Sequence, residues 1–186
     1  MIINYLHKIG WFVGLVLLQV LILNNVHIVG YATPFLYIYL ILKFESDVPR
    51  NALMLWAFFL GLAVDILSDT PGMNAAATVL LAFLRPTFLR LFVPRDTLDT
   101  LVPAIRTMGI SPFLKYLVAS VLVHHGMLLT LEFFSFVHIG ALLLRIVTST
   151  LLTVACIMAV EGNTEEVKKR LQVMLLVFIT HMFVIE

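Results

Sequence analysis

The chain has 186 residues, of which 61% are apolar and only 12% are charged, and its mean hydropathy is +1.05. Soluble proteins average roughly 45–50% apolar and about 25% charged residues, so this composition excludes a soluble domain and indicates an integral membrane protein. The formal net charge of +1 gives no reason to expect nucleic acid or an acidic substrate as a partner, and the single cysteine excludes an intrachain disulfide.

Six apolar segments, separated by clusters of Pro, Gly, Asn and charged residues, are predicted to span the membrane as helices. The number agrees with the chain length, which at about 20 residues per span allows roughly five to seven crossings. The first segment follows Lys8, and because no small-residue cleavage site comes after it, we expect a retained helix rather than a signal peptide. The six segments are 9–24, 31–42, 51–67, 73–92, 113–134 and 137–160.

The second segment is the shortest, because its twelve residues cover only about 18 Å of a hydrocarbon core roughly 30 Å thick. Thr33 and Pro34 are typical of a helix N-terminus, and a re-entrant hairpin is the alternative. The positive-inside rule favours a crossing, since without it the basic region 90–115 would lie outside the cell. We therefore predict an all-α protein with six transmembrane helices and both termini in the cytoplasm.

The third and fourth segments are predicted to pack closely as a hairpin. Ala57 and Gly61 are four residues apart, as are Gly10 and Gly14 in the first segment, and this spacing favours close helix contacts. The fourth segment begins with small residues at 74–78, which leave room for a neighbouring helix.

Charged side chains inside the spans are the first candidates for function, because they are costly in hydrocarbon. Asp65 and Asp69 are four residues apart, but Asp69 belongs to a Pro/Gly turn, so we do not expect a catalytic pair. Asp65 and Arg145 both lie in the outer half of their spans, which allows an intramembrane ion pair; independent snorkelling is the alternative. Further candidates for lining a cavity or contacting a partner are Tyr37, Arg85 and Glu132.

The remaining polar groups give no indication of a catalytic, metal or cofactor site. Arg85 lies in the inner half of the fourth span and is expected to reach the cytoplasmic headgroups. His124 and His125 are adjacent in the fifth span and point about 100° apart, so we expect packed or hydrogen-bonded side chains rather than metal ligands. No Gly-rich phosphate loop, H-E-x-x-H or G-x-S-x-G pattern occurs. We therefore expect no catalytic site, no metal site and no cofactor.

Two polar regions lie outside the predicted spans. Residues 93–112 are predicted to form a cytoplasmic connector, either solvated or carrying a short surface helix at 98–108. Charged residues continue after the sixth span to Arg170, and the apolar residues that follow are too few for a typical span. We therefore divide the chain into a six-helix transmembrane domain, 1–170, and an apolar tail, 171–186, at the interface or packed on the bundle.

The predicted hairpin also carries a recognisable pattern. Within residues 59–75 the sequence reads G-L-x-x-D, then a short turn with Pro and Gly, and then N-A. This pattern resembles the signature stretch of the bacterial rod-shape-determining family MreD, and the length and the six predicted spans agree with that family. The matching positions are Gly61, Asp65, Pro71, Gly72 and Asn74.

The resemblance implies a function and a fold. MreD proteins are non-enzymatic subunits of the cell-elongation complex in the bacterial inner membrane, so the implied partners are MreC and, through it, MreB, RodA and penicillin-binding protein 2, besides membrane lipids; self-association stays open. The implied fold is similar to that of the substrate-binding subunits of energy-coupling-factor transporters. The alternative is an outward-facing small-solute binding subunit of a transporter, and an enzyme acting on lipid or peptide comes third. The transporter pocket would use Tyr31, Tyr37, Tyr39, Asp65, Glu132, His138 and Arg145.

Overall fold

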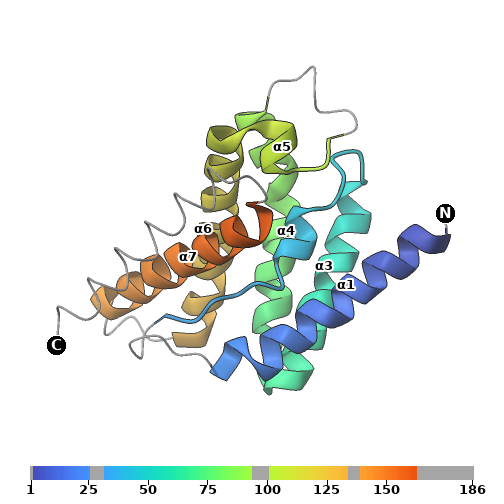
Figure 1. The fold of residues 1–186 in the computed structure, drawn as a ribbon. Helices are drawn as coiled ribbons and strands as arrows, with labels where there is room; N and C mark the ends of the chain where they lie inside the picture. Colours follow the sequence, from blue (N-terminus) through green and yellow to red (C-terminus); the bar gives the residue numbers. More distant parts are fainter. Residues whose placement is uncertain (1, 26–31, 94–100, 134–138, 163–186) are drawn as a thin grey trace.

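The computed structural model of the chain describes residues 2–25, 32–93, 101–133 and 139–162. Its regular elements are helices, and five of those described are long and apolar enough to cross a membrane (Figure 1). These five are α1 (Ile2–Leu21), α3 (Arg50–Ser68), α4 (Met73–Phe92), α6 (Ile110–Phe133) and α7 (Ile139–Glu161). The short elements are η1 (Leu23–Asn25), α2 (Tyr39–Leu42) and α5 (Ile105–Met108). The chain thus has the helices of a multi-pass membrane protein.

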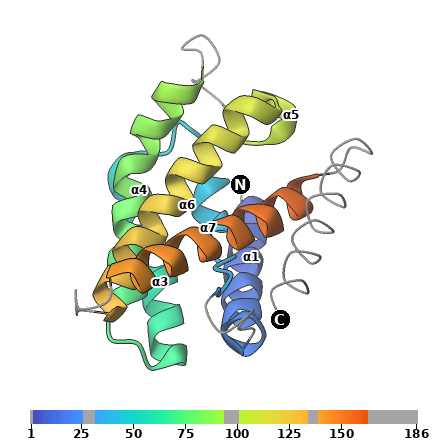
Figure 2. The same ribbon diagram turned by 90° about the vertical axis from the view of Figure 1, so that its left-hand side faces the viewer.

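Helix α4 lies at the centre of the bundle, between α3 and α6 (Figure 1). Helix α7 packs on α6 and crosses it obliquely, and α1 lies against α3 (Figure 2). The faces on which α3 and α4 meet carry small and branched apolar residues. The side chains buried completely there are Leu53, Ala57 and Leu60 of α3 and Ala77 and Leu81 of α4. The predicted close hairpin of the third and fourth segments is confirmed.

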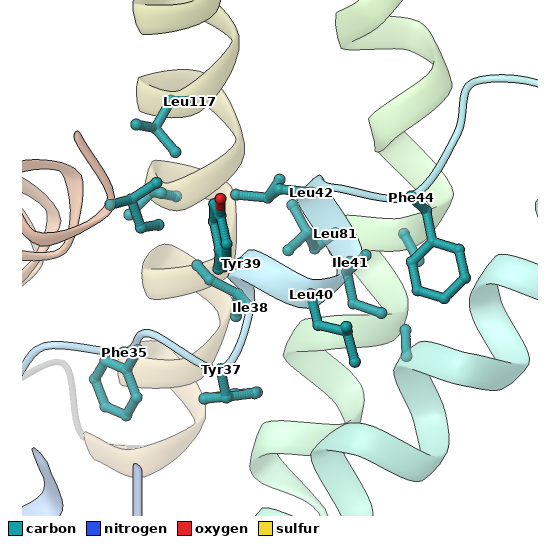
Figure 3. Packing of buried hydrophobic residues seen from close by; sticks show 14 of the residues in the cluster. Phe35, Tyr37, Ile38, Tyr39, Leu40, Ile41, Leu42, Phe44, Leu81 and Leu117 are labelled. Carbon is teal, nitrogen blue, oxygen red and sulfur yellow. The ribbon is translucent and has the colours of Figure 1, made fainter. Parts of the chain in front are cut away.

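The second predicted span does not form a helix, so the prediction of six transmembrane helices is wrong for this segment. Residues 33–36 are extended, and only the four residues of α2 are helical. Pro34 explains part of the difference, since the residue before a proline is driven toward extended backbone. The segment from Ala32 to Phe44 is nevertheless buried, apart from partial exposure at Lys43, and it crosses over one side of α6 and α4 (Figure 3).

Side chains of the surrounding helices bind the backbone of this extended segment. Three buried N–H groups donate to side-chain oxygens: Thr33 to Ser149 Oγ at 3.2 Å, Phe35 to Thr153 Oγ1 at 3.1 Å and Leu36 to Gln19 Oε1 at 2.9 Å. The Gln19 amide also donates to the carbonyl of Pro34 at 3.0 Å. Irregular backbone at membrane depth is tolerated only where protein or water satisfies it, and here α1 and α7 do so.

The opposite end of the segment is fixed to the loop before α5. The N–H of Ser46 donates to the carbonyl of Leu101 at 2.9 Å, and the N–H of Leu101 donates to Ser46 Oγ at 3.0 Å. Leu101 and Ile105 are buried, so this part of the predicted connector is docked rather than solvated. Of the predicted surface helix 98–108, only Ile105–Met108 is helical among the described residues.

The C-terminal end of α7 and the N-terminal part of α1 both lie near residues 43–45. Lys43 pairs with Glu161 at 2.9 Å, and Lys8 pairs with Glu45 at 3.4 Å. We refer to this end of the bundle as the Ser46 end and to the α3–α4 turn as the Asp65 end. The apolar tail 171–186 lies outside the described residues.

Candidate functional site

The turn between α3 and α4 is organised around the carboxylate of Asp65, which is almost fully buried. Its Oδ1 accepts hydrogen bonds from the backbone N–H of Asn74 at 3.0 Å, from the Asn74 amide at 3.0 Å and from the Thr70 hydroxyl at 2.8 Å. Its Oδ2 accepts from the N–H of Ala75 at 2.9 Å. A carboxylate at a helix N-terminus satisfies free N–H groups and faces the positive end of the helix dipole. Asp65 thus caps α4 from the preceding helix.

Gly61 is placed where α3 and α4 come closest. A Cβ atom at this position would overlap Thr78 Oγ1 and lie 2.5 Å from Ala75 Cα, so no larger residue fits without separating the helices. Thr78 Oγ1 donates across the contact to the carbonyl of Ala57 at 2.9 Å. The predicted small-residue spacing of Ala57 and Gly61 is therefore a real helix contact.

The other predicted small-residue pair, Gly10 and Gly14, faces open space. A Cβ atom at either position would meet no other atom within 4 Å, so no described helix of this chain packs on that face of α1. The same spacing thus marks a packed surface in α3 and an uncovered one in α1.

The tight reversal after α3 accounts for the rest of the family-like motif. Asp69, the last residue before the turn, has φ 54°, and Gly72 has φ 78°, a left-handed conformation that favours glycine. Asp69 and Pro71 are exposed, whereas Asp65 is buried. The two aspartates are therefore divided between an internal cap and a water-facing turn, as the sequence predicted.

Hydrogen bonds continue from this turn into the middle of the bundle. The Tyr37 hydroxyl donates to Asn74 Oδ1 at 2.9 Å and lies 2.9 Å from His124 Nε2. The neighbouring His125 bonds through Nε2 to Thr153 Oγ1 at 3.2 Å. Both imidazoles are fully buried and hydrogen-bonded, which confirms the expectation for this pair. Tyr37 is therefore an interior residue of the bundle.

A second buried polar cluster centres on Arg85. Its Nε donates to the Tyr116 hydroxyl at 3.1 Å, and its Nη2 donates to the carbonyls of Leu42 and Phe44. The Tyr116 hydroxyl also donates to the Leu42 carbonyl at 3.1 Å. The expectation that Arg85 snorkels to the headgroups is wrong, because the side chain points inward and binds the carbonyls at the end of α2.

The proposed ion pair between Asp65 and Arg145 does not form. Arg145 Nη2 lies 3.3 Å from Glu132 Oε1, and the guanidinium stacks on Phe133 with 5.0 Å between its carbon and the ring centroid. Both side chains of the Glu132–Arg145 pair are partly exposed on α6 and α7. Asp65 has no need of a counter-charge, since the N-terminus of α4 supplies its donors.

The residues predicted to line a transporter pocket are dispersed. Tyr37 and Asp65 belong to one internal network, Glu132 and Arg145 form a separate pair, and Tyr39 donates to Glu161 at 2.6 Å near the Ser46 end. Tyr31 and His138 lie outside the described residues. Within the part of the chain that the structure describes, no group of three or more His, Cys, Asp or Glu side chains could hold a metal ion.

Four polar side chains that bind the backbone of residues 33–42 were not among the predicted site residues. Gln19, Ser149 and Thr153 bind residues 33–36, and Tyr116 binds Leu42. A signal was present, because Ser149 and Thr153 are four residues apart and lie on one face of α7. Polar residues spaced in this way in an apolar helix indicate that this face forms hydrogen bonds with a neighbouring segment, but the spacing does not identify the segment or its conformation.

No protein-family model, no curated protein and no solved structure matches the chain.

Proposed function

We propose that the chain is a non-enzymatic scaffold subunit of the bacterial cell-elongation complex, of the MreD type, and that it helps maintain cell shape by binding MreC and thereby linking to peptidoglycan synthesis. The observation that carries the proposal is the α3–α4 hairpin. Four of the five residues of the family-like pattern have a defined task in it. Asp65 caps α4, Asn74 donates to Asp65, Gly61 permits the close contact and Gly72 makes the turn.

The distribution of polar groups supports a scaffold rather than a reaction centre. The buried side chains of Asp65, Arg85 and Gln19 form hydrogen bonds with the backbone and side chains of this chain. The outward surfaces of the long helices are mainly apolar, with exposed residues such as Leu55, Phe59 and Leu143. Such surfaces engage lipids and the transmembrane helices of other proteins through shape and a few polar contacts.

Helix α1 offers the widest uncovered face. Only 17% of its span is buried in the described structure, against 33–44% for the other four long helices. We therefore assign the outward face of α1, with Gly10, Val13, Gly14 and Leu17, as the surface for a partner's transmembrane helix.

The proposal includes six crossings with both termini in the cytoplasm. Residues 32–44 would make the second crossing, because Tyr37 is bonded near the Asp65 end and Ser46 is bonded at the opposite end. Lys8, Lys43 and Arg106 then lie toward the cytoplasm, as the positive-inside rule requires. Reporter fusions at residue 100 test this orientation, and a periplasmic signal there would overturn it.

The scaffold role is tested by depletion and by copurification. Depletion in the native rod-shaped cell should give rounded cells, and the purified chain should retain a single-span MreC-like protein in detergent. Continued elongation at normal width without the protein would contradict the role in cell shape.

The partner surface is tested with Gly14→Leu. Because no atom of the described chain lies within 4 Å of a Cβ at Gly14, the substitution should leave the fold intact and reduce copurification. Gly140→Leu is the matched control, since Gly140 also faces open space but lies on α7. Equal retention of the partner by both variants would exclude the face of α1.

A further inference from the structure

A groove lies between α1 and the segment 39–44, near the Ser46 end. Its volume is about 240 Å³, and its lining residues are Lys8, Trp11, Leu15, Tyr39, Leu40, Lys43 and Phe44. Pockets for drug-sized ligands measure roughly 300–1,000 Å³. The groove is therefore suited to a headgroup and the first part of one acyl chain rather than to a large solute.

The floor of the groove is apolar and its edge is aromatic. Leu15, Leu40 and Phe44 are buried but line the groove, whereas Trp11 is 44% exposed at its edge. The rings of Trp11 and Tyr39 lie 6.4 Å apart between centroids. Trp and Tyr side chains are enriched where a membrane protein meets the headgroup layer, and this pair at the edge of the groove favours a position at that depth.

The rim presents charges of both signs. Lys8 Nζ lies 3.4 Å from Glu45 Oε2, and these two side chains are 32% and 47% exposed. Lys43 Nζ lies 2.9 Å from Glu161 Oε1, and Glu161 is the more buried partner. A purely anionic headgroup would meet two lysines but also two glutamates. A headgroup with a phosphate and a primary ammonium matches both signs, because the phosphate accepts from the lysines and the ammonium donates to a carboxylate.

We propose that this groove binds one phosphatidylethanolamine molecule. Its phosphate lies between Lys8 and Lys43, its ammonium donates to Glu45, and the start of one acyl chain packs on Leu15 and Leu40. The proposal needs the chain to be in a membrane but does not depend on the cell-elongation role.

Native mass spectrometry of the full chain in detergent tests the site, with added phosphatidylethanolamine, phosphatidylcholine or phosphatidylglycerol. The quaternary ammonium of phosphatidylcholine cannot donate a hydrogen bond, and phosphatidylglycerol carries no cation. We therefore expect one molecule of phosphatidylethanolamine to be retained more strongly than either. Stronger retention of phosphatidylglycerol, or equal retention of all three, would overturn the proposal.

Variants at the rim test the phosphate contact and the ammonium contact separately. Lys8→Gln should weaken binding of both phosphatidylethanolamine and phosphatidylglycerol by roughly two- to five-fold, the size of one partly exposed ionic contact. Glu45→Gln should weaken only phosphatidylethanolamine and so remove its preference over phosphatidylglycerol. Lys115→Gln, at an exposed position on α6, is the matched control and should change nothing. Unfolding midpoints identical to the parent protein show that the variants are folded, and an equal loss with the control would mean non-specific lipid.

The apolar residues 171–185, which lie outside the described residues, are the competing occupant to be tested. A photoreactive phenylalanine derivative at Trp11 distinguishes the two. Cross-links to phosphatidylethanolamine support the proposal, and cross-links to a peptide from the C-terminal segment overturn it.

Discussion

Asp65 accepts two hydrogen bonds from Asn74, one from its backbone N–H and one from its side-chain amide, each at 3.0 Å. The first turn of α4 is therefore capped by a side chain of α3 and not by the residue at its own N-cap position, Gly72, which has no side chain to donate or accept. The two helices are joined by these bonds as well as by the turn, so the hairpin forms one unit.

Asp65→Asn should lower the free energy of unfolding by about 2–3 kcal/mol. Hydrogen bonds to a charged acceptor contribute roughly 1.5–3 kcal/mol, and the new amide would direct a donor at an N–H group of α4. Denaturant titration in mixed micelles measures the change, with maleimide labelling of Cys156, the single cysteine, as the readout. Asp69→Asn is the control, because Asp69 is exposed, and comparable losses in the two variants would contradict the internal cap.

Gly61→Ala should cost about 1–3 kcal/mol of stability, the range seen when a methyl group is forced into a packed contact. The added Cβ would lie within 2.6 Å of backbone atoms of Ala75, which cannot move without shifting α4. Gly126→Ala is the matched control, since a Cβ there has no neighbour within 4 Å. The same titration compares the two variants, and an unchanged midpoint for Gly61→Ala would mean that the helices are further apart than described.

Arg85→Lys should destabilise the protein by about 2 kcal/mol or more, although it keeps the charge. A lysine cannot reproduce the planar fork that binds Tyr116 and the carbonyls at the end of α2 together, and each lost bond leaves a buried acceptor unsatisfied. Arg90→Lys, at an exposed position of the same helix, should be neutral. If Arg85 reached the headgroups instead, lysine would replace it without loss, and the two variants would unfold alike.

The Glu132–Arg145 pair should tolerate exchange of its charges. Both partners are partly exposed, so their coupling should be at most about 1 kcal/mol, and the double variant Glu132→Arg with Arg145→Glu should accumulate better than either single one. The exchange of Asp65 with Arg145 should give no recovery, because Asp65 faces N–H groups that need an acceptor. Membrane-fraction immunoblots measure all variants, and recovery in the second exchange alone would reverse the assignment of partners.

Hydropathy located four of the five long helices closely, whereas the first, predicted at 9–24, begins seven residues earlier as α1. The segments predicted at 51–67, 73–92, 113–134 and 137–160 correspond to α3, α4, α6 and α7, with ends that differ by at most three residues. An apolar run of about 20 residues that ends in polar or turn residues has few other solutions in a membrane. The hairpin contact at Gly61 could also be predicted from the sequence, because small-residue spacing is a local pattern.

The extended segment and Arg85 could not be predicted in the same way. Residues 33–36 are apolar enough for a helix, and what holds them extended is a set of hydrogen bonds from α1 and α7, which are distant in sequence. Likewise, the position of Arg85 in its span permits either an outward or an inward side chain, and the free carbonyls after α2 decide between them. Both outcomes depend on tertiary partners that no local pattern contains.

The backbone N–H groups of Thr33 and Phe35 depend on acceptors from a much later part of the chain. Their acceptors, Ser149 and Thr153, are made 116 and 118 residues later, so at about 5–20 residues per second these N–H groups wait roughly 6–24 s for their partners. During that interval the segment cannot settle in lipid as an independent unit, since its unpaired amides would face hydrocarbon. If residues 32–44 make the proposed second crossing, chains truncated before α7 should leave this stretch in the translocon or in water, because α7 supplies the acceptors that its insertion needs.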